Sequence, residues 1–325
     1  QRIDMKSYNA VLAVAALLLT AGCSSAPLSQ GQASAGATGG QQIQVGVIPI
    51  VDVAPIYLGK QQGFFEEEGL SLELVPAQGG AAIVPAVTSG TMDFGFSNIS
   101  SMLLAKSKGL DVKVVTSGAG STGEEGRDFG GILVAKDSQL TSPADLAGKT
   151  VAVNTLNNIN DTTVRASVRK AGGDPSTIKF VELAFPDMQA ALERGQVDAI
   201  QVVEPFLATG TGAGARLLAS NYVDTADKLT VGAYFTTAAN ASSNPDLVKK
   251  FTAAMEKSLK YAQENPDAVR KILPTYTKID EATAEKLTLP GFAAEINRSG
   301  VEQLVTLSKG DGLLKSDVNL DELLP

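Results

Sequence analysis

The sequence has no histidine, no tryptophan and a single cysteine among its 325 residues. Without an imidazole there is no Ser-His-Asp triad, no Cys-His pair and no His-ligated metal centre. One cysteine cannot form an internal disulfide or a cysteine-rich zinc site. These absences predict a protein without catalytic residues, metal or cofactor, which acts by binding through hydrogen bonds, helix ends and shape.

Charged and aromatic residues are also few, at 19% and 5% of the chain. The net charge of −8 and the isoelectric point near 4.8 argue against nucleic acid as a partner, because a nucleic-acid surface needs a basic face. The apolar fraction of 44% is typical of a packed protein, and the length predicts two domains or one large one.

A short apolar run near the N-terminus has the features of an export signal. Met5 is a plausible start, Lys6 supplies a positive charge, and the ten residues Ala10–Leu19 are apolar. A run of ten is too short to span a bilayer and fits the apolar region of a signal peptide. We therefore expect a signal peptide over residues 1–22.

The segment that follows, Leu19–Ser25, resembles a bacterial lipobox, in which cleavage precedes a cysteine that becomes lipidated. It departs from the usual pattern because Thr20 stands where leucine is preferred. The resemblance implies lipidation of Cys23, and the alternative is an ordinary signal peptide with a chance cysteine. Residues 24–42 contain Ser, Ala, Gly and Gln four times each and show no apolar period, so residues 23–42 are predicted to be a lipid-anchored, flexible tether.

From Ile43 onward, short β-rich runs alternate with helical segments. The first series of expected strands comprises Ile43–Ile50, Leu70–Gln78, Asp93–Asn98, Asp111–Ser117 and Gly131–Lys136. The second series comprises Lys149–Asn154, Ile178–Leu183, Asp198–Val203 and Ala215–Ala219, and the chain returns through Gly232–Ala239. This alternation predicts an α/β protein with largely parallel sheets.

The two series contain a matching junction. Gly90–Asp93 closes one helix and opens the strand that ends at Asn98, and Gly195–Asp198 does the same before Val203. Each glycine is expected in the left-handed conformation that ends a helix. Ligands in open α/β sheets lie beyond the carboxyl ends of the strands. The segments after Asn98 and Val203 are therefore predicted to line opposite walls of one cleft.

The residues from Gly148 to Phe206, GKTVAVNTLNNINDTTVRASVRKAGGDPSTIKFVELAFPDMQAALERGQVDAIQVVEPF, resemble the nitrate/sulfonate/taurine-type substrate-binding proteins of ABC importers. That group is related to the thiamine-pyrimidine-binding family. The resemblance implies an α/β fold of the two-lobed, periplasmic-binding-protein-like type (type II), with a mixed, mostly parallel sheet in each lobe and a two-segment hinge. Lobe 1 is expected to comprise residues 43–137 and 231–325, and lobe 2 residues 138–230, with the crossings near 136–138 and 230–234.

The same resemblance implies the partners. They are a small-molecule solute, the transmembrane subunits of an ABC permease, and a membrane reached through the lipid anchor. A monomer is expected, held at the outer face of the cytoplasmic membrane or in the periplasm. A tethered sensor is an open alternative. Relatives that act as enzymes, a pyrimidine synthase and a desulfinase, depend on His or a reactive Cys, so no enzymatic activity is expected.

Several residues at strand ends are candidate ligand contacts. Gly79, Gly80 and Ala81 open a helix whose N–H groups suit an anion, although the glycines alone explain a tight turn. Ser100 is expected to cap the next helix, which leaves Asn98 for the solute.

Asparagine is concentrated between Asn154 and Asp161, beyond what one turn and one cap require. Asn160 or Asp161 is expected to cap the following helix, while Asn154, Asn157 and Asn160 are predicted to contact solute.

Three further candidates carry a carboxylate or a phenol. Glu204 can accept from an amino group of the solute or hold the hinge. Asp52 lies just after the first expected strand, where the family lines the cleft. Tyr234 lies on the returning segment and offers a flat apolar face with a polar tip. For both, plain packing or solvation is the alternative. Helix ends favour an anion whereas the two carboxylates disfavour one, so a taurine-like zwitterion reconciles both. A small anion such as a sulfonate, a thiamine-precursor pyrimidine and a small aromatic carboxylate stay open.

Overall fold

The computed structural model describes residues 39–325 as one compact unit. The expected signal peptide, Cys23 and most of the expected tether lie outside these residues. The first strand begins at Gln41, so the last two residues of the expected tether are in the fold.

The first sheet contains five strands in the order β2-β1-β3-β10-β4. Strands β2, β1 and β3 run parallel, and β10 is antiparallel to both of its neighbours. The bounds are β1 (Gln41–Val47), β2 (Leu70–Pro76), β3 (Phe94–Asn98), β4 (Lys113–Gly120) and β10 (Thr230–Thr236). Since all five residues of β3 and all seven of β10 are buried, the centre of this sheet is covered on both faces.

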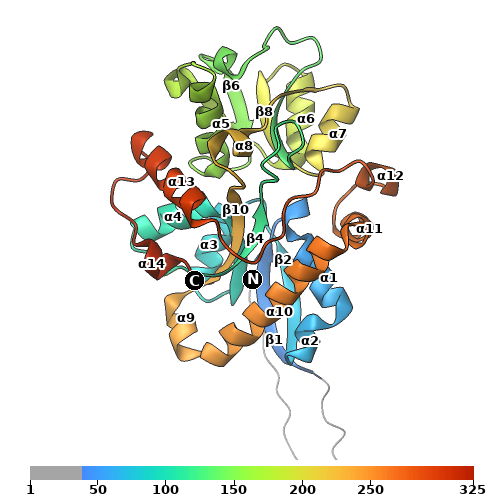
Figure 1. Ribbon diagram of the computed structural model, residues 1–325, viewed down its shortest axis with the longest axis vertical. Coiled ribbons are helices and arrows are strands. Elements are labelled where there is room, and N and C mark those ends of the chain that lie inside the picture. Colours follow the sequence, from blue (N-terminus) through green and yellow to red (C-terminus); the bar gives the residue numbers. More distant parts are fainter. Residues whose placement is uncertain (1–38) are drawn as a thin grey trace, which may run out of the picture. The chain divides into compact units, whose positions relative to one another are not determined.

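The second sheet has the corresponding order β7-β6-β8-β5-β9, with the antiparallel strand β5 in the place of β10. Its bounds are β5 (Gly130–Val134), β6 (Thr150–Val153), β7 (Lys179–Glu182), β8 (Ala199–Val203) and β9 (Arg216–Ala219). Figure 1 shows this sheet and its helices in the upper part and the first sheet below. The expected fold class, α/β with two mixed, mostly parallel sheets, is confirmed.

Helices cover both sheets. With the first sheet lie η1 (Val51–Val53), α1 (Ala54–Gln62), α2 (Phe64–Glu67), α3 (Gly80–Thr88) and α4 (Ile99–Ser107). With the second lie η2 (Pro143–Leu146), α5 (Ile159–Lys170), η3 (Pro175–Thr177), α6 (Phe185–Glu193), α7 (Phe206–Gly212) and α8 (Asn221–Thr225). The predicted echo between the halves is confirmed, because Gly90 and Gly195 follow α3 and α6 with φ of 79° and 67°.

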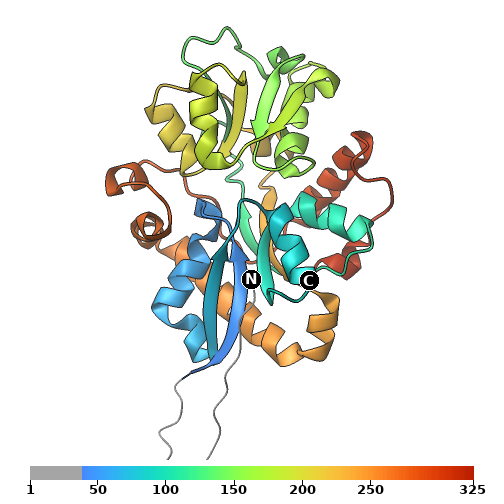
Figure 2. The same cartoon turned by 180° about the vertical axis from the view of Figure 1, so that it is seen from behind.

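The C-terminal part consists of α9 (Ala238–Ser243), α10 (Pro245–Glu264), α11 (Pro266–Tyr276), α12 (Glu281–Ala284), α13 (Arg298–Gly310) and α14 (Leu320–Leu323). Figure 2 shows α10 (orange) passing behind the strands of the first sheet. The ring of Phe251 in α10 stacks on the ring of Phe94 in β3, with the ring centroids 3.9 Å apart. Helix α13 packs against α5 of the second half, and Arg169 forms an ion pair with Asp311 there. The C-terminal helices therefore contact both halves.

Strand pairing bears on the expected lobe boundary. Strand β5 hydrogen-bonds β8 and β9 of the second sheet, although residues 130–134 were expected in lobe 1. The first passage between the sheets therefore runs from Gly120 to Gly130, earlier than the expected 136–138. The sequence pattern identified β5 as a strand but could not reveal its partners. We propose lobes of residues 43–129 with 230–325, and 130–229.

Candidate functional site

Four predicted residues line one small cavity where the two sheets meet. They are Asp52, Asn98, Asn154 and Asn160, and the cavity they share measures about 20 Å³. Asp52 belongs to η1 and Asn98 ends β3, both in the first half, whereas Asn154 follows β6 and Asn160 lies in α5 of the second. Because strand ends converge there, residues from both halves of the chain line one cavity. We call this space the inner cavity.

A second, larger cavity adjoins the inner one. It measures about 510 Å³ and shares Ile48, Ile50 and Phe185 with it. Apolar side chains dominate its lining, and Phe206 and Tyr276 add two further rings. Its size lies in the range of sites for small molecules. We call it the outer cavity.

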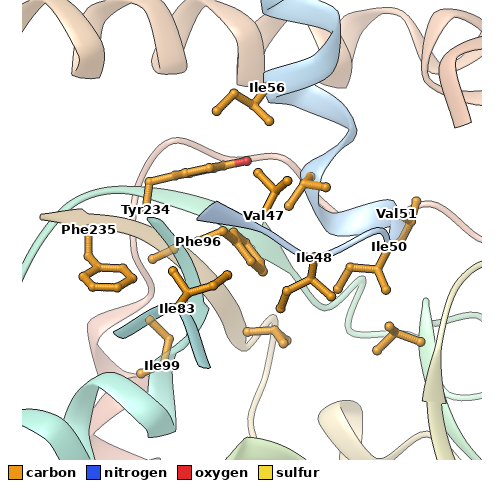
Figure 3. Close-up of a cluster of buried hydrophobic side chains, with 14 of the residues drawn as sticks. Val47, Ile48, Ile50, Val51, Ile56, Ile83, Phe96, Ile99, Tyr234 and Phe235 are labelled. Carbon is orange, nitrogen blue, oxygen red and sulfur yellow. The ribbon is translucent and has the colours of Figure 1, made fainter. Parts of the chain in front are cut away.

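Ile48 and Ile50, which follow β1, line both cavities. Figure 3 shows Ile48 near the ring of Phe96 and Val47 near the ring of Tyr234, with Ile50 and Val51 farther along the same segment. The hydroxyl of Tyr234 points toward the chain segment that carries Val47 and Val51, and Tyr234 is fully buried. This hydroxyl finds no hydrogen-bond partner among residues 39–325. The predicted cleft residue Tyr234 thus lies in the core behind the inner cavity.

The expected cap at the start of α4 is wrong. Asn98, and not Ser100, is the N-cap, since its Oδ1 accepts from the backbone N–H of Ser101 at 2.9 Å. The same Oδ1 accepts from the N–H of Ile159 in the second half at 3.3 Å, and Nδ2 donates to Ser101. Ser100 is buried and its Oγ has no partner within the described chain. The amide of Asn98 is therefore used by protein contacts, one of them between the halves.

The asparagine-rich segment is also organised differently from the expectation. The N-cap of α5 is Asn158, and not Asn160 or Asp161, since the helix begins at Ile159. Asp161 completes a capping box by accepting from the N–H of Asn158 at 2.8 Å. Asn157 is exposed with φ of 57°, a conformation that asparagine tolerates in a turn. Its side chain does not line either cavity.

Asn154 and Asn160 lie next to each other in a buried hydrogen-bond chain. Nδ2 of Asn160 donates to Oδ1 of Asn154 at 2.7 Å, and the hydroxyl of Tyr222 donates to Oδ1 of Asn160 at 2.6 Å. Nδ2 of Asn158 donates to the same oxygen of Asn154 at 3.2 Å. This chain fixes the wall of the inner cavity and uses most of the polar atoms of its amides. Sequence reasoning did not identify Tyr222, and no pattern around α8 marks it.

The glycines before α3 have separate surroundings. A Cβ at Gly79 would lie 2.7 Å from Cγ2 of Thr155 and 3.2 Å from Nδ2 of Asn154, both in the second half. A Cβ at Gly80 would lie 2.8 Å from the Cα of Ser97 in the same half. Gln78 donates to the carbonyl of Asn154 across the same contact at 3.4 Å. Ala81 is exposed and lines neither cavity.

Glu204 is buried at the junction of the halves. Its Oε2 accepts from the N–H of Ala208 at 3.1 Å, and Oε1 accepts from that of Thr288 at 3.4 Å. The backbone N–H of Val51 donates to the backbone carbonyl of Glu204 at 3.0 Å. Burial raises the pKa of this carboxyl to about 7, against the lowering effect of these two N–H groups and of Arg270. These contacts are the structural role that the sequence left as one of two options.

Asp52 has a buried carboxyl group with an oxygen that is unpaired within residues 39–325. It is 2% exposed, and its Oδ1 has no hydrogen-bond partner within the described part of the chain. Burial, aided by the nearby Asp128, raises the pKa of Asp52 to about 7. Asp128, whose pKa burial also raises, accepts from Ser121 and Thr122 in the passage between the sheets. A buried carboxyl without a partner is costly unless it stays protonated or meets a cation.

Over residues 39–325, no helix is both long and apolar enough to span a bilayer. In the same range, no cluster of three or more His, Cys, Asp or Glu side chains has the arrangement of a metal site.

Residues 50–269 match the family model described as NMT1/THI5 like, and the chain belongs to this family. Its solved structural relatives include the alkanesulfonate-binding protein SsuA from Xanthomonas axonopodis pv. citri bound to MOPS. That structure shares 20% identity and has a TM-score of 0.73, covering 87% of this chain and 98% of the other. The family match confirms the predicted family, and the structural likeness confirms the periplasmic-binding-protein fold.

Sequence relatives carry names of two kinds. The taurine-binding periplasmic protein of Escherichia coli (strain K12) is 26% identical over 204 residues, covering 63% of this chain and 61% of the other. The 4-amino-5-hydroxymethyl-2-methylpyrimidine phosphate synthase of Aspergillus parasiticus is 26% identical over 231 residues, covering 66% of this chain and 64% of the other. The chain is therefore similar both to a protein named for binding and to one named for synthesis.

Proposed function

We propose that the chain is the extracytoplasmic solute-binding protein of an ABC importer, which binds a small solute between its lobes and delivers it to a membrane permease. One observation carries the proposal: the strand ends of two matching sheets meet at adjoining inner and outer cavities. Membership of the NMT1/THI5-like family, and similarity to a taurine-binding periplasmic protein, support it.

Binding would act by moving the lobes together. The bond between Ile159 and Asn98, and that between Gln78 and Asn154, join the lobes at the inner cavity. Neither bond survives separation of the lobes. A solute that contacts both walls adds free energy only to the closed form, and therefore shifts the population toward it. A permease can then distinguish the loaded protein by its closed shape.

The proposal predicts a thermal shift with one class of solute. Protein starting near Gln41 is unfolded and refolded to remove bound solute, then heated with taurine, alkanesulfonates, nitrate, small carboxylates or aminopyrimidines. A solute at 100 times its Kd stabilises by about 2.7 kcal/mol, which raises Tm by about 5 °C for a chain of this size. X-ray scattering should show a smaller radius of gyration with the same solute. A panel without any shift would contradict the proposed function.

We also propose lipid attachment at Cys23. In a bacterial host, the full chain should partition into the detergent phase of a Triton X-114 extract, because two or more acyl chains anchor a protein firmly. Cys23→Ala should move it to the aqueous phase, whereas Ser24→Ala should leave it in the detergent phase. An aqueous wild-type protein would favour an ordinary signal peptide instead.

Binding is favoured over catalysis because the sequence lacks histidine and its one cysteine lies in the predicted lipobox. A pyrimidine ligand is the second candidate, favoured by the name of the Aspergillus parasiticus relative and by the aromatic rings of the outer cavity. Taurine, other zwitterions and small anions stay within the proposal as the sequence predicted them. A tethered sensor would show the same lobe closure without stimulating a permease.

A further inference from the structure

The inner cavity contains a buried acid and no base. Asp52 lines it, and none of its lining residues within the described chain is Lys or Arg. Burial and the neighbouring Asp128 both disfavour ionisation of Asp52. The other titratable groups affected by its charge are the phenols of Tyr222, Tyr234 and Tyr276. An anion placed here would meet no opposite charge and would lie beside a carboxyl.

This cavity keeps one free donor and one free acceptor, because Nδ2 of Asn154 donates to no residue of the described chain and Oδ1 of Asp52 accepts from none. Asn98 and Asn160 use their amides on protein partners, as does the Oδ1 of Asn154. Oδ1 of Asp52 is unsatisfied by any residue of the described chain and is fully buried. A donor from the solute is the partner that this oxygen lacks.

The volumes separate a small polar group from a larger apolar one. About 20 Å³ admits a group the size of one water molecule, and an ammonium group has that size. The adjoining outer cavity of about 510 Å³ is lined mainly by apolar and aromatic side chains. Lys278 is its one cationic lining residue and is exposed.

We propose that the solute is an organic amine, whose protonated nitrogen enters the inner cavity and donates to Asp52 while its apolar body fills the outer cavity. This inference rests on the proposed function, because it names the solute class of the same cleft. Pairing with the ammonium group gives the unpaired Oδ1 of Asp52 a hydrogen-bond donor and gives its buried carboxylate an opposite charge. An alkyl or aryl chain accounts for the apolar lining, which a compact polar zwitterion such as taurine does not need.

The test uses probes that differ only in their head group. Titration calorimetry at pH 7.5 compares hexylamine, hexanol and hexanesulfonate, and then phenethylamine, 2-phenylethanol and 3-phenylpropanoate. Each amine is expected to bind at least about tenfold more tightly than its alcohol, and each anion more weakly still. Asp52→Asn should reduce the affinity for the amine to that for the alcohol. Asp246→Asn, an equal change of charge on the exposed start of α10, should leave the preference intact.

The outcomes separate the two proposals. If sulfonates or taurine bind and close the lobes while amines do not, the inference is overturned and the proposed function stands. In that case Lys278→Gln should weaken the binding of the anion. If amines bind equally to the wild type and to Asp52→Asn, the inference is also overturned. If neither these probes nor the wider solute panel binds or closes the lobes, the proposed function itself fails.

Discussion

Raising the pH from 5 to 7 is expected to tighten the binding of hexylamine at least about fivefold, because the amine should bind the charged form of Asp52 at least about tenfold more tightly than the neutral form. The pKa of Asp52 is about 7 in the solute-free protein, so about 1% of this carboxyl is charged at pH 5 and about half at pH 7. The amine stays protonated throughout, because its own pKa is near that of lysine, about 10.4. The affinity should therefore rise with pH and level off above about pH 8. Calorimetry between pH 5 and 9 measures the profile.

Two controls test whether the pH dependence of amine binding comes from Asp52. Asp52→Asn should bind the amine weakly and with little dependence on pH, since the titrating partner is gone. An anionic solute should show the opposite trend, because ionisation of Asp52 and Glu204 adds negative charge around the cleft as the pH rises. Amine affinity that stays constant from pH 5 to 8 in the wild type would contradict pairing with Asp52.

The carboxyls of Asp52 and Glu204 also make the free energy of unfolding depend on pH. Their pKa values are raised in the folded state to about 7, from reference values of 3.8 for Asp52 and 4.5 for Glu204. Between about pH 4 and 7 the folded state therefore binds more protons than the unfolded state. It follows that these groups lower the free energy of unfolding as the pH rises through this window, with little further change above about pH 8. Solute-free protein supplies the baseline against which binding is compared.

The sequence predicted the architecture better than the details of the site because strand and helix periods are local properties. The alternation of short strands with helices, and the matching glycines Gly90 and Gly195, depend on neighbours within a few residues. The pairing of β5 does not depend on such close neighbours, since its partner strands β8 and β9 follow it by more than 60 residues. The expected hinge position was therefore the weakest part of the fold prediction.

The site shows the same division between local and long-range information. Composition marked the asparagines around Asn154 as exceptional, and Asn154 and Asn160 do line the inner cavity. It could not reveal that Tyr222 uses the oxygen of Asn160, because the two residues are 62 positions apart. Asp52 was identified only through the family's cleft position. That its Oδ1 lacks a partner follows from packing, which no sequence pattern contains.

Gly79 and Gly80 are expected to respond very differently to the same substitution. At Gly80 an added Cβ meets the backbone of Ser97 within the first sheet, so the fold itself must shift. Overpacking of this kind costs about 1–3 kcal/mol, and Gly80→Ala should lower the free energy of unfolding of the solute-free protein by that amount. Urea unfolding measures the loss.

At Gly79 the added Cβ meets Thr155 and Asn154, which belong to the opposite lobe. The backbone there is extended, with φ of −168° and ψ of 166°, so alanine introduces no strain of its own. The clash exists only while the lobes are closed, and an open form can avoid it. Gly79→Ala should therefore unfold at nearly the same urea concentration as the wild type, yet bind the solute identified in the panel at least about tenfold more weakly. Scattering should show incomplete closure at saturating solute.

The pair of variants separates closure from folding because both make the same chemical change at adjacent positions. If the lobes must meet for binding, affinity falls in Gly79→Ala without a matching loss of stability. If the solute instead binds to one lobe alone, Gly79→Ala should bind like the wild type, and the contact between Gly79 and Thr155 would then be packing without a role in recognition. That second result would remove lobe closure from the mechanism while leaving Asp52 and the inner cavity as its polar centre.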